Sequence, residues 1–310
     1  MTVIAVTGGA GFIGSNLVRS LLNLEIYKLI VIDDLSTGLE SNITGLNLDF
    51  RNVSITEPQL MRKALSDVDT IVHLAARGSV PRSIMDPVAT HLTNTLGTLN
   101  VLEICRERHC NLIFSSSSSV YGANTALPKS EEMWLQPISP YAASKLGAEA
   151  FVSAYSSTYG LNTTLLRFFN VFGPRQRPDH EYAAVLPKWI WRALNGLPLE
   201  VHGDGNQTRD FTYVKTVCDI ISIAINKKVY GPEVINMAYG NNVSLNDVLS
   251  KLESKFPKLE VEYLPTRIGD VRNSQNDPTR LRAKFPEVIP VPFDEAFEET
   301  YNWLKNLSGK

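Results

Sequence analysis

The sequence has little of what marks a disulfide-linked, metal-binding or nucleic-acid-binding protein. Its three cysteines, Cys105, Cys110 and Cys218, form no Cys-x-x-Cys pair, which favours a reducing compartment over a disulfide scaffold. The five histidines lack the spacing of metal ligands, so we expect no metal site. A net charge of -2 provides no general basic field, which argues against nucleic acid or an anionic membrane as a partner.

Long hydrophobic runs are also absent. No stretch of about 18 uncharged apolar residues occurs, and the chain starts with a strand-like segment rather than a basic region followed by an apolar signal core. We therefore expect a cytoplasmic protein with no membrane partner. With 310 residues, of which 44% are hydrophobic, the chain can build a buried core in one large domain or two ordinary ones.

What the sequence does have is a glycine-rich turn. Residues 7–14, Thr-Gly-Gly-Ala-Gly-Phe-Ile-Gly, follow the apolar run at 3–6 and precede a helix-like stretch. Glycine permits a tight turn and close approach of the backbone to a pyrophosphate, and a helix start supplies amides and a positive dipole end. The spacing Gly8-x-x-Gly11-x-x-Gly14 departs from Gly-x-Gly-x-x-Gly, and ordinary strand-to-helix connections also use glycine.

A carboxylate in the right place indicates which nucleotide the turn would bind. The apolar run at 29–32 ends at Asp33, where a carboxylate can accept hydrogen bonds from an adenosine ribose. Asp33 and Asp34 would repel a 2'-phosphate, and no Arg or Lys lies between Asp33 and Ser36 to offset that repulsion. The pattern favours NAD, with a strand that ends in an ordinary solvated Asp as the alternative.

The order of the predicted elements indicates the fold class. Short apolar runs alternate with longer helix-like segments, and these runs lie at residues 3–6, 29–32, 70–74, 112–114 and 164–168. Repeated strand-helix units predict an α/β fold with a Rossmann-type, doubly wound parallel sheet. After Asn170, glycine- and proline-punctuated shorter elements predict a smaller second lobe built from discontinuous segments.

Three side chains are candidates for catalysis. Tyr141 and Lys145 are four residues apart on a predicted helix and therefore share a face, where the ammonium would lower the pKa of the phenol and make it a base near neutral pH. Such pairs are also common on partly exposed helix faces. Ser117 lies in the run of serines at 115–119, which follows an apolar strand and so falls at the ligand-binding edge of a parallel sheet. A polar serine-rich loop is the alternative for that run.

These features together resemble the extended short-chain dehydrogenase/reductase superfamily. The resemblance covers essentially the entire chain and includes the glycine turn, Ser117, the Tyr141-x-x-x-Lys145 pair and the stretch Leu-Arg-Phe-Phe-Asn at 166–170. The sequence is more narrowly similar to nucleotide-sugar 4-epimerases, whose substrate-lobe signatures recur at 209–211, as Arg-Asp-Phe, and at 267–270, as Arg-x-Gly-Asp.

The resemblance implies a role for each catalytic candidate. Ser117 would hydrogen-bond the sugar 4-hydroxyl, Tyr141 would be the acid and base, and Lys145 would hold the nicotinamide ribose. The implied reaction is a transient oxidation to a 4-keto sugar that rotates and is reduced on its opposite face, so NAD is regenerated in each cycle. The related 4,6-dehydratases carry Asp-Glu where this chain has Ser118 and Ser119, and the related decarboxylases carry Glu at the second position, which favours an epimerase.

Three further segments narrow the expected substrate. Residues 78–84, 170–176 and 182–187 resemble UDP-N-acetylglucosamine 4-epimerases. Ser274 matches the position that, in that family, lines the space for the 2-substituent of the sugar. A small residue there implies that UDP-GlcNAc and UDP-GalNAc are accepted as well as UDP-Glc and UDP-Gal. An ordinary loop serine is the alternative reading of Ser274.

The resemblance also implies the remaining contacts. Arg209 and Arg267 would clamp the diphosphate, Asp270 would bind the uridine ribose, and His202 would stack on uracil unless it is a solvent-facing loop histidine. The expected substrate-binding residues are Gly78, Ser79, Ser117, Tyr141, Asn170, Gln176, Ala184, Val185, His202, Arg209, Arg267, Asp270 and Ser274. The expected NAD-binding residues are Gly8, Gly11, Phe12, Ile13, Gly14, Asp33, Asp34, Ser36, Thr37, Gly38, Asp49, Phe50, Leu74, Ala75, Ala76, Asn94, Ser115, Tyr141, Lys145 and Phe168.

Two alternative functions are considered, and the resemblance also implies an oligomeric state. UDP-glucuronate 4-epimerase is resembled at 120–125, but those enzymes have Thr where Asn170 stands. An inactive NAD-binding regulator would be free to lose the three catalytic candidates, all of which are present. Relatives pair through two long helices, which here would be 94–108 and 141–159, so a homodimer is implied.

The domain division follows from the change to shorter, glycine- and proline-punctuated elements after Asn170. We predict that residues 1–168 and about 211–238 form the NAD-binding Rossmann domain. Residues of about 169–210 and 239–310 would form the smaller α/β lobe that binds the nucleotide sugar.

Overall fold

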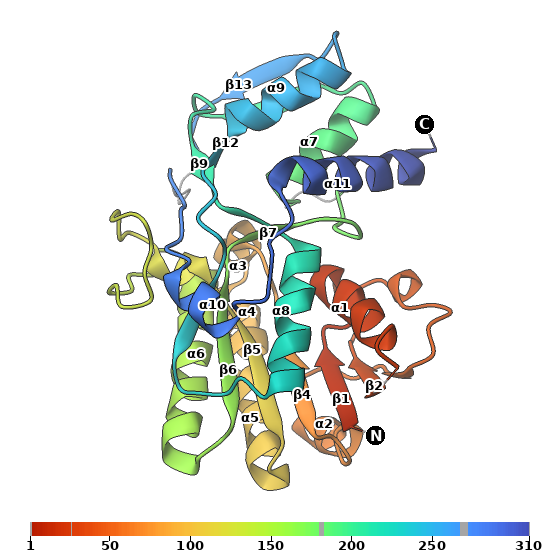
Figure 1. Ribbon diagram of the computed structural model, residues 1–310, viewed down its shortest axis with the longest axis vertical. Helices are drawn as coiled ribbons and strands as arrows, with labels where there is room; N and C mark the ends of the chain where they lie inside the picture. Colours follow the sequence, from red (N-terminus) through yellow and green to blue (C-terminus); the bar gives the residue numbers. More distant parts are fainter. Residues whose placement is uncertain (1, 26, 180–182, 267–271, 310) are drawn as a thin grey trace.

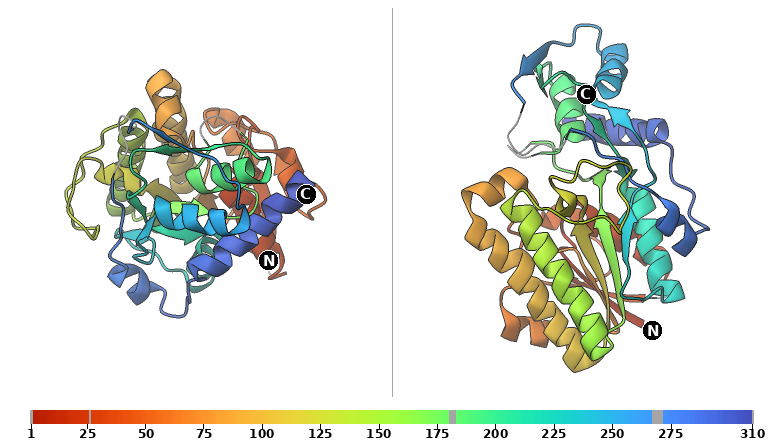
Figure 2. Two further views of the ribbon diagram at one scale, coloured as in Figure 1. Left: turned by 90° about the horizontal axis from the view of Figure 1, so that it is seen from above. Right: turned by 90° about the vertical axis from the view of Figure 1, so that its left-hand side faces the viewer.

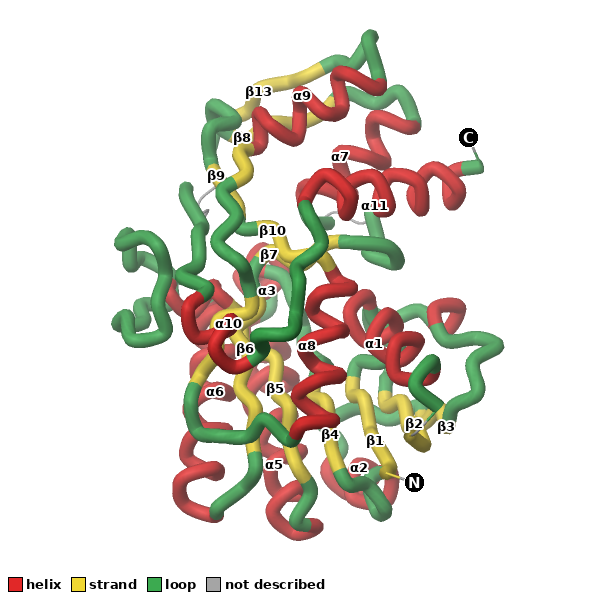
Figure 3. The backbone as a smooth tube through the Cα atoms, in the orientation of Figure 1, coloured by secondary structure: helices red, strands yellow, loops and turns green. Residues whose placement is uncertain are grey.

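A parallel sheet lies at the centre of the structure. The computed structural model describes residues 2–25, 27–179, 183–266 and 272–309. A seven-stranded sheet has the order β11-β6-β5-β4-β1-β2-β3, and every neighbouring pair is parallel (Figures 1 and 3). Its strands are β1 (Thr2–Thr7), β2 (Tyr27–Ile32), β3 (Asp49–Arg51), β4 (Thr70–His73), β5 (Asn111–Ser117), β6 (Thr163–Phe168) and β11 (Val234–Met237). The predicted Rossmann-type α/β fold is confirmed.

Helices cover both faces of this sheet, which explains why its strands read as continuous apolar runs. Ile4 and Val6 on β1 pack into the core shared with α1 and α8, whereas Ala5 points into the core shared with α2, α5 and α6. The helices are α1 (Phe12–Leu22) and α8 (Val214–Lys227) on one face, and α2 (Pro58–Ala64), α5 (Gly97–Arg108) and α6 (Pro140–Tyr159) on the other (Figure 1).

The second part of the molecule lies beyond the carboxyl ends of the sheet strands (Figures 1 and 2). Its helices are α7 (Val185–Leu194), α9 (Leu245–Lys255) and α11 (Phe293–Ser308), and a parallel pair is formed by β8 (Leu199–His202) and β13 (Val261–Leu264). Short pairs link it to the sheet, namely β7 (Asn170–Phe172) with β10 (Phe211–Tyr213) and β9 (Thr208–Arg209) with β12 (Val243–Ser244). The smaller elements are η1 (Glu40–Asn42), α3 (Val80–Met85), α4 (Pro87–His91), η2 (Leu92–Leu96), η3 (Ser118–Tyr121) and α10 (Thr279–Lys284).

The start of α6 is fixed by its local sequence. Ser139 caps the helix because its hydroxyl accepts a hydrogen bond from Ala142 N at 3.1 Å, and Pro140 occupies the first helical position, where a missing N–H costs nothing. The helix ends at Gly160, whose φ of +66° suits a left-handed cap. Tyr141 therefore lies in the first turn, at the edge of the sheet where β5 also ends.

In the described ranges, no helix combines the length and the apolar character needed to cross a bilayer.

Candidate active site

A cleft of about 460 Å³ opens at the carboxyl ends of the central strands. Its walls come from the turn after β1, the ends of β2 and β5, and the segment after β4. The strand order reverses beside β1, which has β2 on one side and β4 on the other. Ligands of open α/β sheets bind outside such a reversal point, so the topology and the cleft agree on the site.

The glycine turn forms a backbone cradle in this cleft. A Cβ atom at Gly14 would lie 2.2 Å from the Gly8 carbonyl oxygen, and one at Gly8, whose φ is +71°, would lie 2.7 Å from Ala75 N. Gly11 precedes α1 without a side-chain cap, so no side chain occupies the amides of the first helical turn there. A pyrophosphate fits such a cradle.

Asp33 ends β2 beside the cradle. Its carboxylate accepts hydrogen bonds from Ala10 N at 3.0 Å and from Leu35 N at 2.9 Å. Burial raises the pKa of Asp33, and these two backbone bonds oppose that shift. A Cβ atom at Gly38 would lie 2.8 Å from Asp33 Oδ1, so only glycine leaves this carboxylate room. The cradle and the carboxylate together fit a dinucleotide that ends in an unphosphorylated ribose.

The structure brings the three catalytic candidates into the same cleft. Ser117, Tyr141 and Lys145 all line it. Ser117 Oγ lies 2.5 Å from Ser119 Oγ, and the Lys145 ammonium lies 4.7 Å from the centroid of the Phe114 ring. A phenol, a hydroxyl and an ammonium are thus assembled at one edge of the sheet.

The predicted lowering of the Tyr141 pKa is wrong. Burial of the phenol raises its pKa, because a phenolate loses its hydration in this position, and the hydrogen bond with Ser117 only partly opposes that shift. Lys145 is itself buried, which lowers its pKa to about 8 against the opposing effect of Glu149. In this protein, Ser117 is therefore the group whose hydrogen bond favours a Tyr141 phenolate.

A buried ion pair behind the site was not predicted from the sequence. Glu149 on α6 and Arg167 on β6 form hydrogen bonds at 2.5 and 3.0 Å, and Ser116 on β5 donates to the same carboxylate at 2.6 Å. Arg167 also donates to the hydroxyl of Tyr121 at 2.8 Å. The bidentate pair connects the helix that carries Tyr141 to both neighbouring strands.

A second cavity of about 280 Å³ adjoins the cleft, and both are lined by Ser117, Phe168 and Phe169. Its lining residues come from widely separated parts of the chain, and they are Val80, Ser117, Ser118, Ser119, Tyr121, Gly122, Lys129, Ile138, Ser139, Phe168, Phe169, Asn170, Arg209, Asn273 and Ser274. The described residues of this lining include two cations and no carboxylate.

Asp210 fixes the backbone beside the second cavity. Its fully buried carboxylate accepts hydrogen bonds from Gly240 N at 3.0 Å, Asn241 N at 3.1 Å and Asn276 N at 2.9 Å. Burial raises the pKa of Asp210 to about 7, and the three backbone bonds oppose that shift. The segment that carries Ser274 is thereby tied to the strand pair that carries Arg209.

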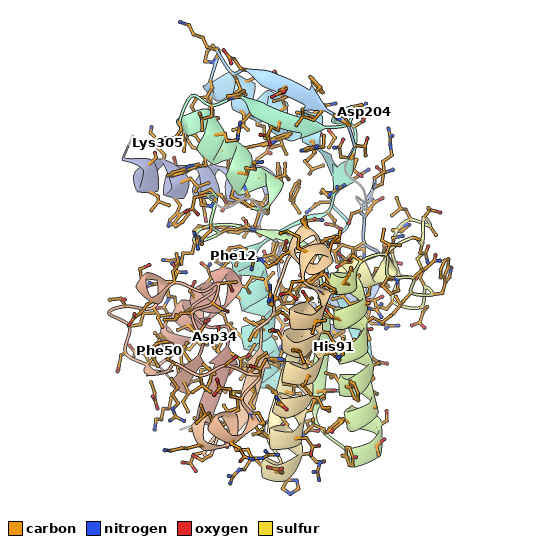
Figure 4. The ribbon with its side chains drawn as sticks, turned by 180° about the vertical axis from the view of Figure 1, so that it is seen from behind. Phe12, Asp34, Phe50, His91, Asp204 and Lys305 are labelled. Carbon is orange, nitrogen blue, oxygen red and sulfur yellow. The ribbon has the colours of Figure 1, made fainter. Side chains whose placement is uncertain are left out.

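Most of the expected NAD-binding residues line the cleft, and four do not. The exceptions are Gly38, Asp49, Phe50 and Asn94. Asp49 is instead paired with Arg51, and Phe50 lies on the edge strand β3 toward the outside of the sheet (Figure 4).

Asn94 supports the cleft from behind. Its side-chain oxygen accepts a hydrogen bond from Arg77 N at 2.7 Å, and its amide donates to Ser144 Oγ at 2.9 Å. Asn94 therefore joins the segment after β4 to α6 without lining the cleft.

Eight of the expected substrate-binding residues line one or both of the two cavities. The cleft is lined by Gly78, Ser117, Tyr141, Gln176 and Ala184, and the second cavity by Ser117, Asn170, Arg209 and Ser274.

Five expected substrate residues are not placed in either cavity. Ser79 caps α3, Val185 opens α7, and His202 Nδ1 lies 3.1 Å from the Pro265 carbonyl oxygen, so these three line neither cavity. Arg267 and Asp270 lie outside the described residues.

The cleft also contains residues that the sequence did not reveal. Arg175 and Arg177 line the cleft, and they flank Gln176, which was expected there. Their position next to Gln176 was the only feature of the sequence that could have indicated them. Other unexpected residues lie within stretches that the sequence singled out, and they are Ile32, Arg82, Ser116, Phe169 and Val171. No pattern pointed to the rest, which are Asn42, Val53, Ile55, Arg77 and Thr93. Figure 4 shows Phe12 where the two parts of the molecule meet, next to this cleft.

Known proteins are similar to this chain in sequence and in fold. Residues 4–238 match the NAD dependent epimerase/dehydratase family. A putative UDP-glucose 4-epimerase from Methanocaldococcus jannaschii is 35% identical, over 98% of this chain and 99% of that protein. The solved structure of UDP-N-acetylglucosamine 4-epimerase from Methanobrevibacter ruminantium M1, in complex with UDP-N-acetylmuramic acid, is 36% identical with a TM-score of 0.92, covering 100% of this chain and 99% of that one.

A third similar protein is a solved UDP-glucuronic acid 4-epimerase from Bacillus cereus in complex with UDP-glucuronic acid and NAD. It is 31% identical with a TM-score of 0.91, over 99% of this chain and all of that one.

The chain belongs to the NAD dependent epimerase/dehydratase family, within the extended short-chain dehydrogenases/reductases. The predicted family and the predicted NAD cofactor are confirmed. The three similar proteins described above are named as UDP-sugar 4-epimerases, which supports that activity and a UDP-sugar substrate for this chain.

Proposed function

We propose that this enzyme interconverts UDP-GlcNAc and UDP-GalNAc, and also UDP-Glc and UDP-Gal, with tightly bound NAD. The observation that carries the proposal is the second cavity, which shares Ser117 with the dinucleotide cleft and has Ser274 in its wall. A sugar whose carbon 4 lies at Ser117 would have room for its substituents in that cavity. The small side chain of Ser274 leaves space for an acetamido group.

Three side chains would carry the chemistry. Ser117 orients the 4-hydroxyl and stabilises the phenolate of Tyr141, which takes the hydroxyl proton and later returns it. NAD, when bound, supplies the two-electron oxidation of carbon 4 and its reversal. The protonated ammonium of Lys145 would hold the nicotinamide ribose of NAD through hydrogen bonds. Burial of the sugar where the two cavities meet would keep water away from the 4-keto intermediate.

The residues after Ser117 argue against water elimination. A 4,6-dehydratase needs a carboxylic acid and base to move protons during that step, whereas Ser118 and Ser119 are neutral hydroxyls near pH 7. The described lining of the second cavity adds no Asp or Glu. The site is suited to oxidation and reduction at carbon 4 alone.

UDP-glucuronate 4-epimerase is the second candidate. The similarity to the Bacillus cereus enzyme and the cations Lys129 and Arg209 in the second cavity favour it. Asn170, in place of the Thr of those enzymes, lines the same cavity and favours the neutral sugars.

One assay separates these functions. The purified protein is incubated, without added NAD, with UDP-GlcNAc, UDP-Glc, UDP-glucuronate or dTDP-glucose, and the products are identified by chromatography. We expect the 4-epimers of the first two sugars. A 4-keto-6-deoxy product, or conversion of UDP-glucuronate alone, would contradict the proposal.

The remaining predictions belong with this function. We propose that residues 1–168 and about 211–238 bind NAD, and that about 169–210 and 239–310 bind the nucleotide sugar. We also propose a cytoplasmic homodimer, and the exposed apolar side chains of Leu96 and Phe151, which lie in the two segments expected to pair, support the dimer. Light scattering that gives a monomer at micromolar concentration would contradict the dimer.

A further inference from the structure

Lys129 is a buried lysine that the mechanism does not use. It lies between η3 and α6, with only 4% of the residue exposed. Its backbone is held on both sides, because its N–H donates to the Gln275 carbonyl at 2.8 Å and its carbonyl accepts from Asp277 N at 2.9 Å. Asn236 on β11 donates to the same carbonyl at 3.2 Å. The position of Lys129 is therefore set by two segments that are distant from it in the sequence, 275–277 and β11.

The charge of Lys129 has no carboxylate partner within the described ranges. Its ammonium donates to the Asn124 carbonyl oxygen and lies 5.8 Å from the centroid of the Tyr121 ring. Burial lowers the pKa of Lys129, and no neighbouring charge among the residues with described positions opposes that shift. Arg167, which is equally buried and lies 5.0 Å from the centroid of the same Tyr121 ring, is by contrast paired with Glu149.

A buried cation without a counter-charge is costly to the folded protein, so its presence at a cavity calls for an explanation. Lys129 lines the second cavity together with Ser117, Ser274 and Arg209. The lysine ammonium has more N–H donors than the single bond to Asn124 uses. A ligand oxygen in the cavity would supply the partner that the described part of the chain does not.

We propose that Lys129 determines substrate specificity by donating a hydrogen bond to an acyl oxygen carried by the sugar, either the amide carbonyl of an acetamido group or a carboxylate. The inference rests on the proposed function, because the reacting carbon at Ser117 is what places the substituents of the sugar in the second cavity. An sp² oxygen with partial or full negative charge is the group that a buried ammonium binds most strongly. Sugars without an acyl group would leave Lys129 as it is in the free enzyme.

The test compares Lys129→Met with the wild-type enzyme on UDP-GlcNAc, UDP-glucuronate and UDP-Glc, which carry an amide, a carboxylate and neither. We expect kcat/KM to fall on the order of 10- to 100-fold for the acylated substrate, mainly through KM, and to change little for UDP-Glc. Lys129→Arg retains the charge and should keep the preference for the acylated sugar. Lys129→Gln can still donate to Asn124 and serves if the Met variant does not fold.

The possible outcomes distinguish an amide from a carboxylate as the group that Lys129 binds, and they distinguish failure of this inference from failure of the proposed function. A selective loss on UDP-GlcNAc identifies the amide, and a selective loss on UDP-glucuronate identifies the carboxylate. Equal losses on all three sugars indicate a structural lysine and overturn the inference, as do unchanged rates. If the wild type converts none of them, the proposed function fails, and calorimetric binding of the same three nucleotides to wild type and variant still tests Lys129 by the same criterion.

Discussion

The two cavities that meet at Ser117 are built in opposite ways. The larger cleft is lined by backbone turns and short stretches that directly follow sheet strands, with Gly8, Asp33 and Ala75 as examples. The second cavity draws Lys129, Arg209 and Ser274 from loops and a short strand far apart in the sequence. The first is therefore set by topology that any member of the fold shares, whereas the second is set by individual side chains. Cofactor binding and sugar choice should accordingly respond to different substitutions.

Removal of the acid and base should stop the reaction without disturbing either cavity. We expect Tyr141→Phe to lower kcat by roughly 10² to 10⁴-fold, the range for loss of a general acid and base. The phenyl ring retains the shape of the site, so the fold and bound NAD should remain. Turnover by chromatography and NAD release on denaturation measure the two effects, and a variant with wild-type kcat would remove Tyr141 from the mechanism.

A substitution in the glycine cradle should affect the cleft alone. Gly14→Ala places a Cβ atom 2.2 Å from the Gly8 carbonyl oxygen, so the turn must shift away from its present path. We expect NAD binding to weaken by roughly 100-fold, by analogy with overpacked sites that cannot relax. Gly231→Ala is the matched control, because a Cβ atom there meets nothing within 4 Å. Equal NAD content in both variants would show that the cradle does not bind the cofactor.

A substitution in the second cavity should alter the choice of sugar and leave NAD in place. We expect Ser274→Tyr to lower kcat/KM for UDP-GlcNAc and UDP-GalNAc by roughly 10- to 100-fold, because the ring fills the space for the acetamido group. UDP-Glc and UDP-Gal should be little affected. Rates on all four nucleotides give the answer, and an equal loss for both pairs would refute the assignment of Ser274.

The pH dependence should reveal the burial of Lys145. Its pKa of about 8 means that the ammonium is progressively lost above pH 8, so the contribution of this charge to kcat/KM should decline there. The contribution to folding has the opposite sign. Between pH 8 and 10.5 the unfolded chain binds the proton and the folded chain does not, so the Lys145 contribution to the free energy of unfolding rises with pH.

Lys145→Arg is the control for this pH profile. A guanidinium stays protonated, so the alkaline decline should move to higher pH. A decline that stays in place would assign it to another group.

The same contrast explains how far the sequence could be interpreted. The glycine turn and Asp33 were predictable, because their chemistry depends on the backbone and on neighbours close in sequence. Val53 and Ile55 were not, since they enter the cleft only because of the path of a loop. His202 lines neither cavity, and its ring lies beside Pro265, so its contact with uracil stays a prediction.

The pKa shifts of the site residues were the other property that the sequence could not predict. The sequence shows that Tyr141 and Lys145 share a helix face, and spacing alone suggests that the cation lowers the pKa of the phenol. The degree of burial, which reverses that shift, depends on the packing of the whole site. Spacing predicts which groups meet, and only the tertiary structure gives the cost of their charges.

Asp210 has a consequence for how such an enzyme can acquire a new substrate. Because one buried carboxylate accepts hydrogen bonds from the amides of Gly240, Asn241 and Asn276, the segment that carries Ser274 is anchored through its backbone. We therefore expect that the side chain at position 274 can be exchanged to suit a different sugar without rebuilding the loop. For the same reason Asp210 is a poor choice for substitution, since its loss would release residues 240–241 and the segment around Asn276 together.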